Sequence, residues 1–173
     1  MFTRWKIIAA SLSAAALLCV GAGAAYAQNH DHSHEAGEAT QLTLNNGKKW
    51  ATDANLRQGM SRIRDALAAE LSAIRAGKAA AKQYQALAQK TNDQIAFMMK
   101  NCKLDQKADA MLHLVLADLT AGADAMMLRD ISKARNGAES IAHALENYAA
   151  YFDHPGWRGL KWMAIYFMGL VTT

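Results

Sequence analysis

Three histidines at alternate positions stand near the start of the chain, in the stretch Gln28-Asn29-His30-Asp31-His32-Ser33-His34. If the processed chain begins at Gln28, its α-amine, two amide nitrogens and the His30 imidazole can form a square of four nitrogens, which suits Cu(II) or Ni(II). His32 and His34 place two further imidazoles within reach. The pattern therefore predicts a Cu(II) site. Two alternatives stay open: a tail that only confers solubility, and a cyclised Gln28 that leaves the histidines as a weaker cluster.

The residues before Gln28 have the three parts of a secretory signal. Arg4 and Lys6 supply the positive charge, residues 7–20 are apolar, and Ala25-Tyr26-Ala27 is a small-x-small cleavage site. We therefore expect a signal peptide over residues 1–27, cleavage after Ala27 and export to the periplasm. The remaining chain is long enough for one domain with its own core.

Composition excludes several function classes. The formal net charge is +4, and two positive charges, Arg4 and Lys6, leave with the signal, so the chain lacks the basic stripe of a nucleic-acid binder. Cys19 lies within the signal, which leaves Cys102 as the only cysteine after cleavage and predicts no internal disulfide. A lone exported cysteine is a buried hydrophobe, an intermolecular partner or a metal ligand.

Apolar periodicity predicts an all-α fold. Residues 28–51 have a polar, turn-rich composition and are expected to form a flexible, disordered arm. Residues 52–154 show apolar residues at spacings of three and four, which predicts four helices. Thr52 is the expected first N-cap, and Gly77 the first stop. Short connections predict an antiparallel, up-down-up-down four-helix bundle.

The end of the chain, residues 155–173, is apolar but short. Its apolar stretch is shorter than the roughly 20 residues of a membrane span, so no span is expected in the mature chain. We expect a short helix that folds onto the bundle or forms a contact with a second copy or another protein.

The expected topology gathers soft metal ligands at one end of the bundle. The residues expected at this end are Met60 in the first helix, Met98, Met99 and Cys102 in the last turns of the second, and Met111 and His113 in the third. Of these, Met60, Met98, Met111 and His113 fall at comparable depth along the helices. Thioether, thiolate and imidazole groups select copper, particularly Cu(I). Asp109, one turn before His113, is a candidate to orient the imidazole. The alternative is that these residues only fill the core.

A resemblance adds a second expectation. Met60, the segment 110–116 and the segment 147–154 resemble the soluble periplasmic b-type cytochromes with a four-helix fold. That resemblance implies haem b, with Met60 and a histidine at the end of the fourth helix, here His154, as axial ligands. The chain has no Cys-x-x-Cys-His motif, so covalent haem attachment is not expected.

A further resemblance covers more of the chain. Residues 42–50, 101–104 and 152–157 are similar to a group of uncharacterised exported bacterial proteins. The similarity implies a periplasmic helical protein linked to heavy-metal handling.

No nucleophile–base pair, phosphate loop or carboxylate dyad stands out, so we expect no enzymatic activity. The sequence favours a periplasmic copper-binding protein for metal buffering or resistance. The alternatives are a b-type haem electron carrier and a metal-free helical adaptor that docks a partner through its C-terminal tail.

Overall fold

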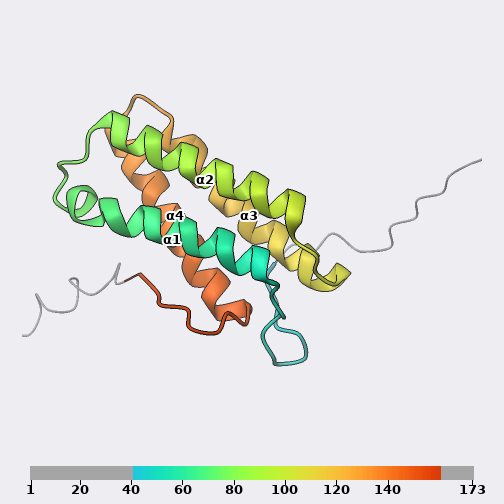
Figure 1. The fold of residues 1–173 in the computed structure, drawn as a ribbon. Coiled ribbons are helices and arrows are strands. Elements are labelled where there is room, and N and C mark those ends of the chain that lie inside the picture. Colours follow the sequence, from blue (N-terminus) through green and yellow to red (C-terminus); the bar gives the residue numbers. More distant parts are fainter. Residues whose placement is uncertain (1–40, 161–173) are drawn as a thin grey trace, which may run out of the picture. The chain divides into compact units, whose positions relative to one another are not determined.

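The computed structural model describes residues 41–160, which form four α-helices (Figure 1). They are α1 (Ala54–Arg75), α2 (Ala81–Asn101), α3 (Gln106–Met126) and α4 (Ile131–Tyr151). Between residues 41 and 160 there is no strand, which confirms the all-α class. The predicted signal peptide, the part of the predicted arm before residue 41 and the part of the predicted tail after residue 160 lie outside the described residues.

Aspartates begin three of the helices. Asp53 Oδ1 accepts a hydrogen bond from the Leu56 amide at 2.7 Å, so Asp53 is the N-cap of α1 and our prediction of Thr52 is wrong by one residue. Asp105 and Asp130 cap α3 and α4 in the same way. Each carboxylate satisfies amides that have no partner within the helix and complements the positive end of its dipole.

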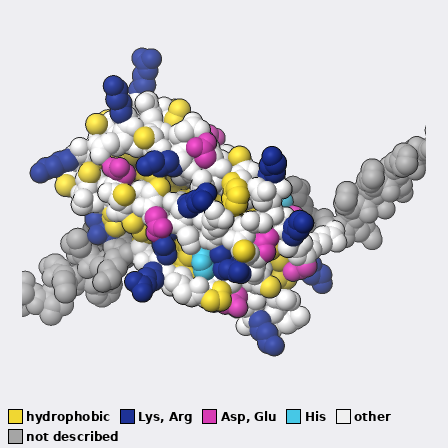
Figure 2. Space-filling model, viewed as in Figure 1, with side chains coloured by type: hydrophobic (Ala, Val, Ile, Leu, Met, Phe, Trp, Pro, Cys, Tyr) yellow, Lys and Arg dark blue, Asp and Glu magenta, His cyan; other side chains and the backbone are white. Residues whose placement is uncertain are grey.

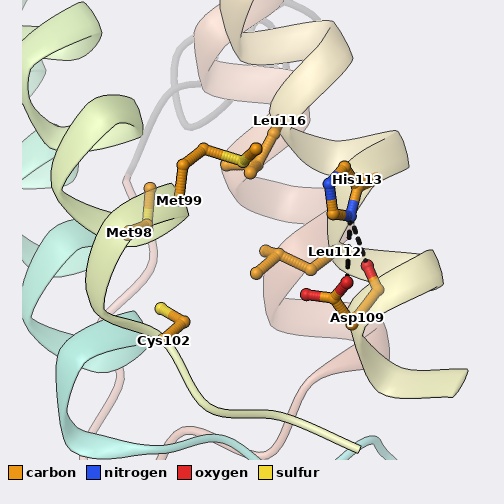
Figure 3. Close-up of a pocket in the computed structure, with 7 residues that line it drawn as sticks. All are labelled: Met98, Met99, Cys102, Asp109, Leu112, His113 and Leu116. Carbon is orange, nitrogen blue, oxygen red and sulfur yellow. Dashed lines mark hydrogen bonds and ion pairs between the residues drawn. The ribbon is translucent and has the colours of Figure 1, made fainter. Parts of the chain in front are cut away.

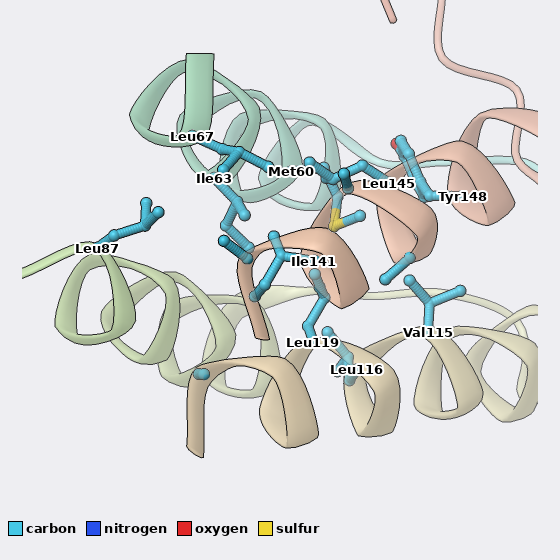
Figure 4. Close-up of a cluster of buried hydrophobic side chains, with 14 of the residues drawn as sticks. Met60, Ile63, Leu67, Leu87, Val115, Leu116, Leu119, Ile141, Leu145 and Tyr148 are labelled. Atoms are coloured by element: carbon cyan, nitrogen blue, oxygen red, sulfur yellow. The ribbon is translucent and has the colours of Figure 1, made fainter. Parts of the chain in front are cut away.

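The core lies between all four helices and is almost wholly apolar (Figure 4). Its fully buried side chains include Met60, Ile63 and Leu67 from α1, Leu87 and Met98 from α2, Val115 and Leu119 from α3, and Ile141, Leu145 and Tyr148 from α4. The two helices α3 and α4 approach most closely at Gly122 and Gly137. A Cβ on Gly137 would lie 2.5 Å from the Gly122 carbonyl oxygen, so no larger residue fits this crossing without movement.

The segment before α1 differs from our prediction of a flexible arm as far as residue 51. Trp50 is only 6% exposed and belongs to the core. Its amide donates to the Tyr151 carbonyl and its carbonyl accepts from the Asp153 amide, both at 2.8 Å. The indole Nε1 donates to the Thr43 carbonyl at 2.6 Å. Burial of the indole and backbone pairing with the end of α4 hold this polar segment in place.

An aromatic cluster follows α4 and begins the predicted C-terminal tail. The ring of Tyr148 stacks on Phe152 with centroids 5.3 Å apart and meets the edge of Trp157 at 5.1 Å. The Arg64 guanidinium lies 5.2 Å from the Trp157 ring centroid, a cation–π contact. This cluster attaches the first tail residues to α1 and α4. Among the described residues, no helix is both long and apolar enough to cross a membrane.

Candidate metal site

A cavity of about 120 Å³ opens between the end of α2 and the first half of α3 (Figure 3). Its lining combines three sulfur-bearing residues with an imidazole, a carboxylate and two leucines: Met98, Met99, Cys102, His113, Asp109, Leu112 and Leu116. Figure 3 shows the sulfur side chains along α2 and His113 on α3, with Leu112 between them. The site thus draws its chemistry from two consecutive helices.

Helical spacing places the sulfur side of this pocket. Met98 and Cys102 are four residues apart, so they lie one turn apart on the same face. Met98 is 1% exposed, and a Cβ on Gly59 would come within 2.4 Å of its Cγ, so glycine at position 59 makes room for this side chain. Met99 is 58% exposed at the rim. The pocket therefore offers one buried and one accessible thioether.

The Cys102 thiol is strongly held in its protonated form. Burial raises its pKa from the ordinary 9.0 to about 12, and the charge and hydrogen bond of Asp53 and the charge of Asp109 add to this rise. Asp53 is fixed in place, because Oδ1 caps α1 and Oδ2 accepts from the Lys103 amide at 2.6 Å. A metal ion bound by this sulfur must therefore displace a proton at neutral pH.

His113 is oriented by the helix turn that precedes it. Its Nδ1 lies 2.9 Å from the Asp109 carbonyl oxygen and 3.5 Å from the Asp109 carboxylate. A carbonyl oxygen only accepts, so Nδ1 carries the hydrogen in this contact, and in the neutral imidazole the lone pair is then on Nε2. This is the arrangement of a metal-binding histidine, with one nitrogen anchored and the other free to ligate. The side chain is 52% exposed, so Nε2 is accessible.

The structure separates the other residues that we predicted as ligands. Met60 is fully buried in the core and does not line this pocket. His154 follows the end of α4 and does not line this pocket; its Nδ1 shares a 2.9 Å hydrogen bond with the Tyr148 hydroxyl. Burial lowers the pKa of His154, and Arg57 and Arg64 add to the effect. His30, His32 and His34 lie outside the described residues.

The contribution of Asp53 was not predicted from the sequence. Met99, which the sequence places beside Met98 in the last turns of α2, lies on the exposed side of the helix and lines the pocket. Asp53 lies at the start of α1, yet its carboxylate reaches the end of α2 through the Lys103 amide. Residues 41–160 contain no group of three His, Cys, Asp or Glu side chains that could hold a metal. Ligation at the pocket therefore depends on the thioethers.

Comparisons of the chain with protein-family models, with curated proteins and with solved structures found no match.

Proposed function

We propose that this is a periplasmic, non-enzymatic helical protein that binds copper for buffering or resistance, with Cu(I) held in the pocket between α2 and α3. One observation carries the proposal: a single pocket gathers the Met98 and Met99 thioethers, the Cys102 thiol and the His113 imidazole. The anchored Nδ1 of His113 leaves Nε2 available as the nitrogen ligand.

The chemistry of this ligand set favours Cu(I) over the other common metals. Calcium and magnesium require several oxygen ligands, and the pocket lining has one carboxylate, Asp109. Thioether sulfur is a soft donor that selects Cu(I) and binds Zn(II) poorly. Two thioethers beside one thiol and one imidazole therefore favour a monovalent soft ion.

The N-terminal arm supplies a separate Cu(II) site in this proposal. Processing after Ala27 gives the α-amine of Gln28 that, with His30, completes four nitrogens, while His32 and His34 extend the set. The mature protein is expected to show the weak visible d–d band of tetragonal Cu(II). His30→Ala should remove this band, and mass spectrometry that finds a different start or a cyclised Gln28 would refute the site.

The directions in which the four helices run are also part of this proposal. We infer an antiparallel, up-down-up-down course for α1 to α4, because the connections 76–80, 102–105 and 127–130 are short. The C-terminal tail, residues 155–173, is the candidate contact with a second copy or a protein partner, and this contact is the basis of the metal-free adaptor alternative.

The geometry supports the haem alternative less well than it supports copper binding. Met60 is packed against Leu145 and Tyr148 in the core (Figure 4), and the Tyr148 hydroxyl holds His154 Nδ1. Haem b between Met60 and His154 would have to displace these buried side chains. A Soret band in protein purified from its host would nevertheless favour haem over the copper proposal.

A Cu(I) competition titration tests the pocket. Reduced protein should take Cu(I) from a chromophoric chelator, and His113→Ala and Cys102→Ser should each lower the affinity by about tenfold or more. The matched control is His143→Ala, because His143 on α4, like His113 on α3, is an exposed histidine with an acidic neighbour, here Glu146 at 3.4 Å. Equal Cu(I) affinity in all variants, with lower melting temperatures for the pocket variants, would assign these residues to packing.

A further inference from the structure

The turn between α3 and α4 exposes three large aliphatic side chains within five residues. Met127 is 49% exposed, Leu128 46% and Ile131 42%. Among the described residues, the other exposed large hydrophobics, Leu44 and Met99, stand singly. Isolated exposed hydrophobics are ordinary on soluble proteins, whereas a contiguous group marks an interaction surface. We call Met127, Leu128 and Ile131 the apolar tip.

Basic side chains lie at the same end of the helices as the apolar tip. Arg129 and Lys133 are exposed in the same turn, and Lys78 and Lys82 are exposed where α1 leads into α2. The two connections lie at the same end of the helices, because Tyr84 in the first turn of α2 is close enough to Arg135 and Glu139 of α4 for their charges to act on it. Figure 2 shows Lys and Arg side chains projecting at this end of the molecule, at the upper left.

The acidic groups near the tip are mostly engaged. The Asp130 carboxylate accepts from the Ser132 and Lys133 amides at 2.9 and 3.2 Å, so the start of α4 compensates its charge. Glu139 pairs with Arg135 at 3.4 Å, and Glu70 accepts from the Gln83 side chain at 2.8 Å. Asp124, in the last turn of α3, is the remaining exposed carboxylate of this turn. Positive charge therefore exceeds negative charge around the tip.

We propose that this end of the helices binds the surface of an anionic phospholipid membrane, with the apolar tip inserted at the level of the headgroups and the four cations against the lipid phosphates. Interfacial binding requires aliphatic side chains that leave water together with cations that meet anionic headgroups. The tip is a helix–helix turn, so it can enter a lipid surface without a complementary groove. This inference rests on residues remote from the copper pocket and is independent of the proposed function.

Vesicle co-sedimentation of the purified full chain tests the proposal. The protein should bind vesicles of equal phosphatidylglycerol and phosphatidylcholine, and binding to pure phosphatidylcholine should be at least tenfold weaker. Leu128→Ser should reduce binding to the anionic vesicles by about tenfold, and the pair Arg129→Ser and Lys133→Ser by about fivefold for each lost cation. The matched control is Leu44→Ser, which removes a leucine of similar exposure, 42% against 46% for Leu128, outside the tip and should leave vesicle binding unchanged.

Each contrary result would overturn the proposal. Absence of binding to anionic vesicles would do so, and so would equal binding to neutral vesicles. Undiminished binding by Leu128→Ser would assign the membrane contact to another part of the chain. Retention on immobilised polyglutamate without any vesicle binding would assign the basic surface to an acidic protein partner instead. Circular dichroism checks that each variant remains folded, which this exposed turn should permit.

Discussion

The reactivity of Cys102 offers a quantitative test of how burial and the nearby Asp53 carboxylate act on the thiol of the pocket. Burial first, and then the Asp53 carboxylate, raise the thiol pKa from 9.0 to about 12. Only the thiolate reacts with iodoacetamide, and three pKa units correspond to about a thousandfold less thiolate at neutral pH. Because Cys102 is partly exposed and water screens its surroundings, we expect alkylation about a hundredfold slower than in the unfolded chain.

The pH profile separates this effect from simple steric protection. Peptide mapping by mass spectrometry should show the Cys102 alkylation rate rising about tenfold per pH unit without levelling off up to pH 10. Asp53→Asn keeps an oxygen that can cap α1 but removes the charge. In this variant the Cys102 thiol should titrate at lower pH and react about tenfold faster at neutral pH. A rate that levels off near pH 9 in the folded protein, or no change in Asp53→Asn, would refute the account of this site.

Three further predictions concern the fold. Gly137→Ala places a Cβ 2.5 Å from the Gly122 carbonyl oxygen and should lower the free energy of unfolding by about 1–3 kcal/mol in urea titrations; unchanged stability would mean that α3 and α4 are not in such close contact. Trp50→Ala should lower the free energy of unfolding by about 3–5 kcal/mol, because the side chain is only 6% exposed. A loss below about 1 kcal/mol would contradict its place in the core. Burial lowers the pKa of His154 below 6.5, so the unfolded chain takes up the proton at higher pH than the folded chain does. The stability that neutral His154 contributes should therefore be present above pH 6.5 and decline as the pH falls through 6.5 towards the folded pKa. His154→Gln should flatten this decline in urea titrations.

The helices could be predicted from the sequence because their signals are local. Apolar spacing predicted the four helices, and Gly77, with φ of +65°, follows the end of α1 as expected. The place of Trp50 could not be predicted in this way. Its backbone pairs with Tyr151 and Asp153, about a hundred residues later, and no local pattern encodes such a contact.

The candidate site shows a similar division. Depth along the helices suggested that Met98, Cys102 and His113 lie near one another, and the structure places all three around one pocket. Depth does not determine which face a side chain occupies. Met60 turns into the core, and Met111 lies under the N-terminal segment, where its sulfur accepts from the Thr43 amide at 3.4 Å. Met60 and Met111 lie away from the pocket because the packing of neighbouring helices fixes the rotation of each helix about its axis.

X-ray absorption spectroscopy of the reduced protein loaded with one equivalent of Cu(I) identifies the atoms that bind the metal. Copper in the pocket should give a Cu(I) edge with sulfur scattering as the main component of the nearest shell, together with the outer-shell pattern of one imidazole that disappears in His113→Ala and persists in His143→Ala. A first shell of nitrogen and oxygen alone, or an imidazole signal that survives His113→Ala, would contradict copper binding at the pocket between α2 and α3.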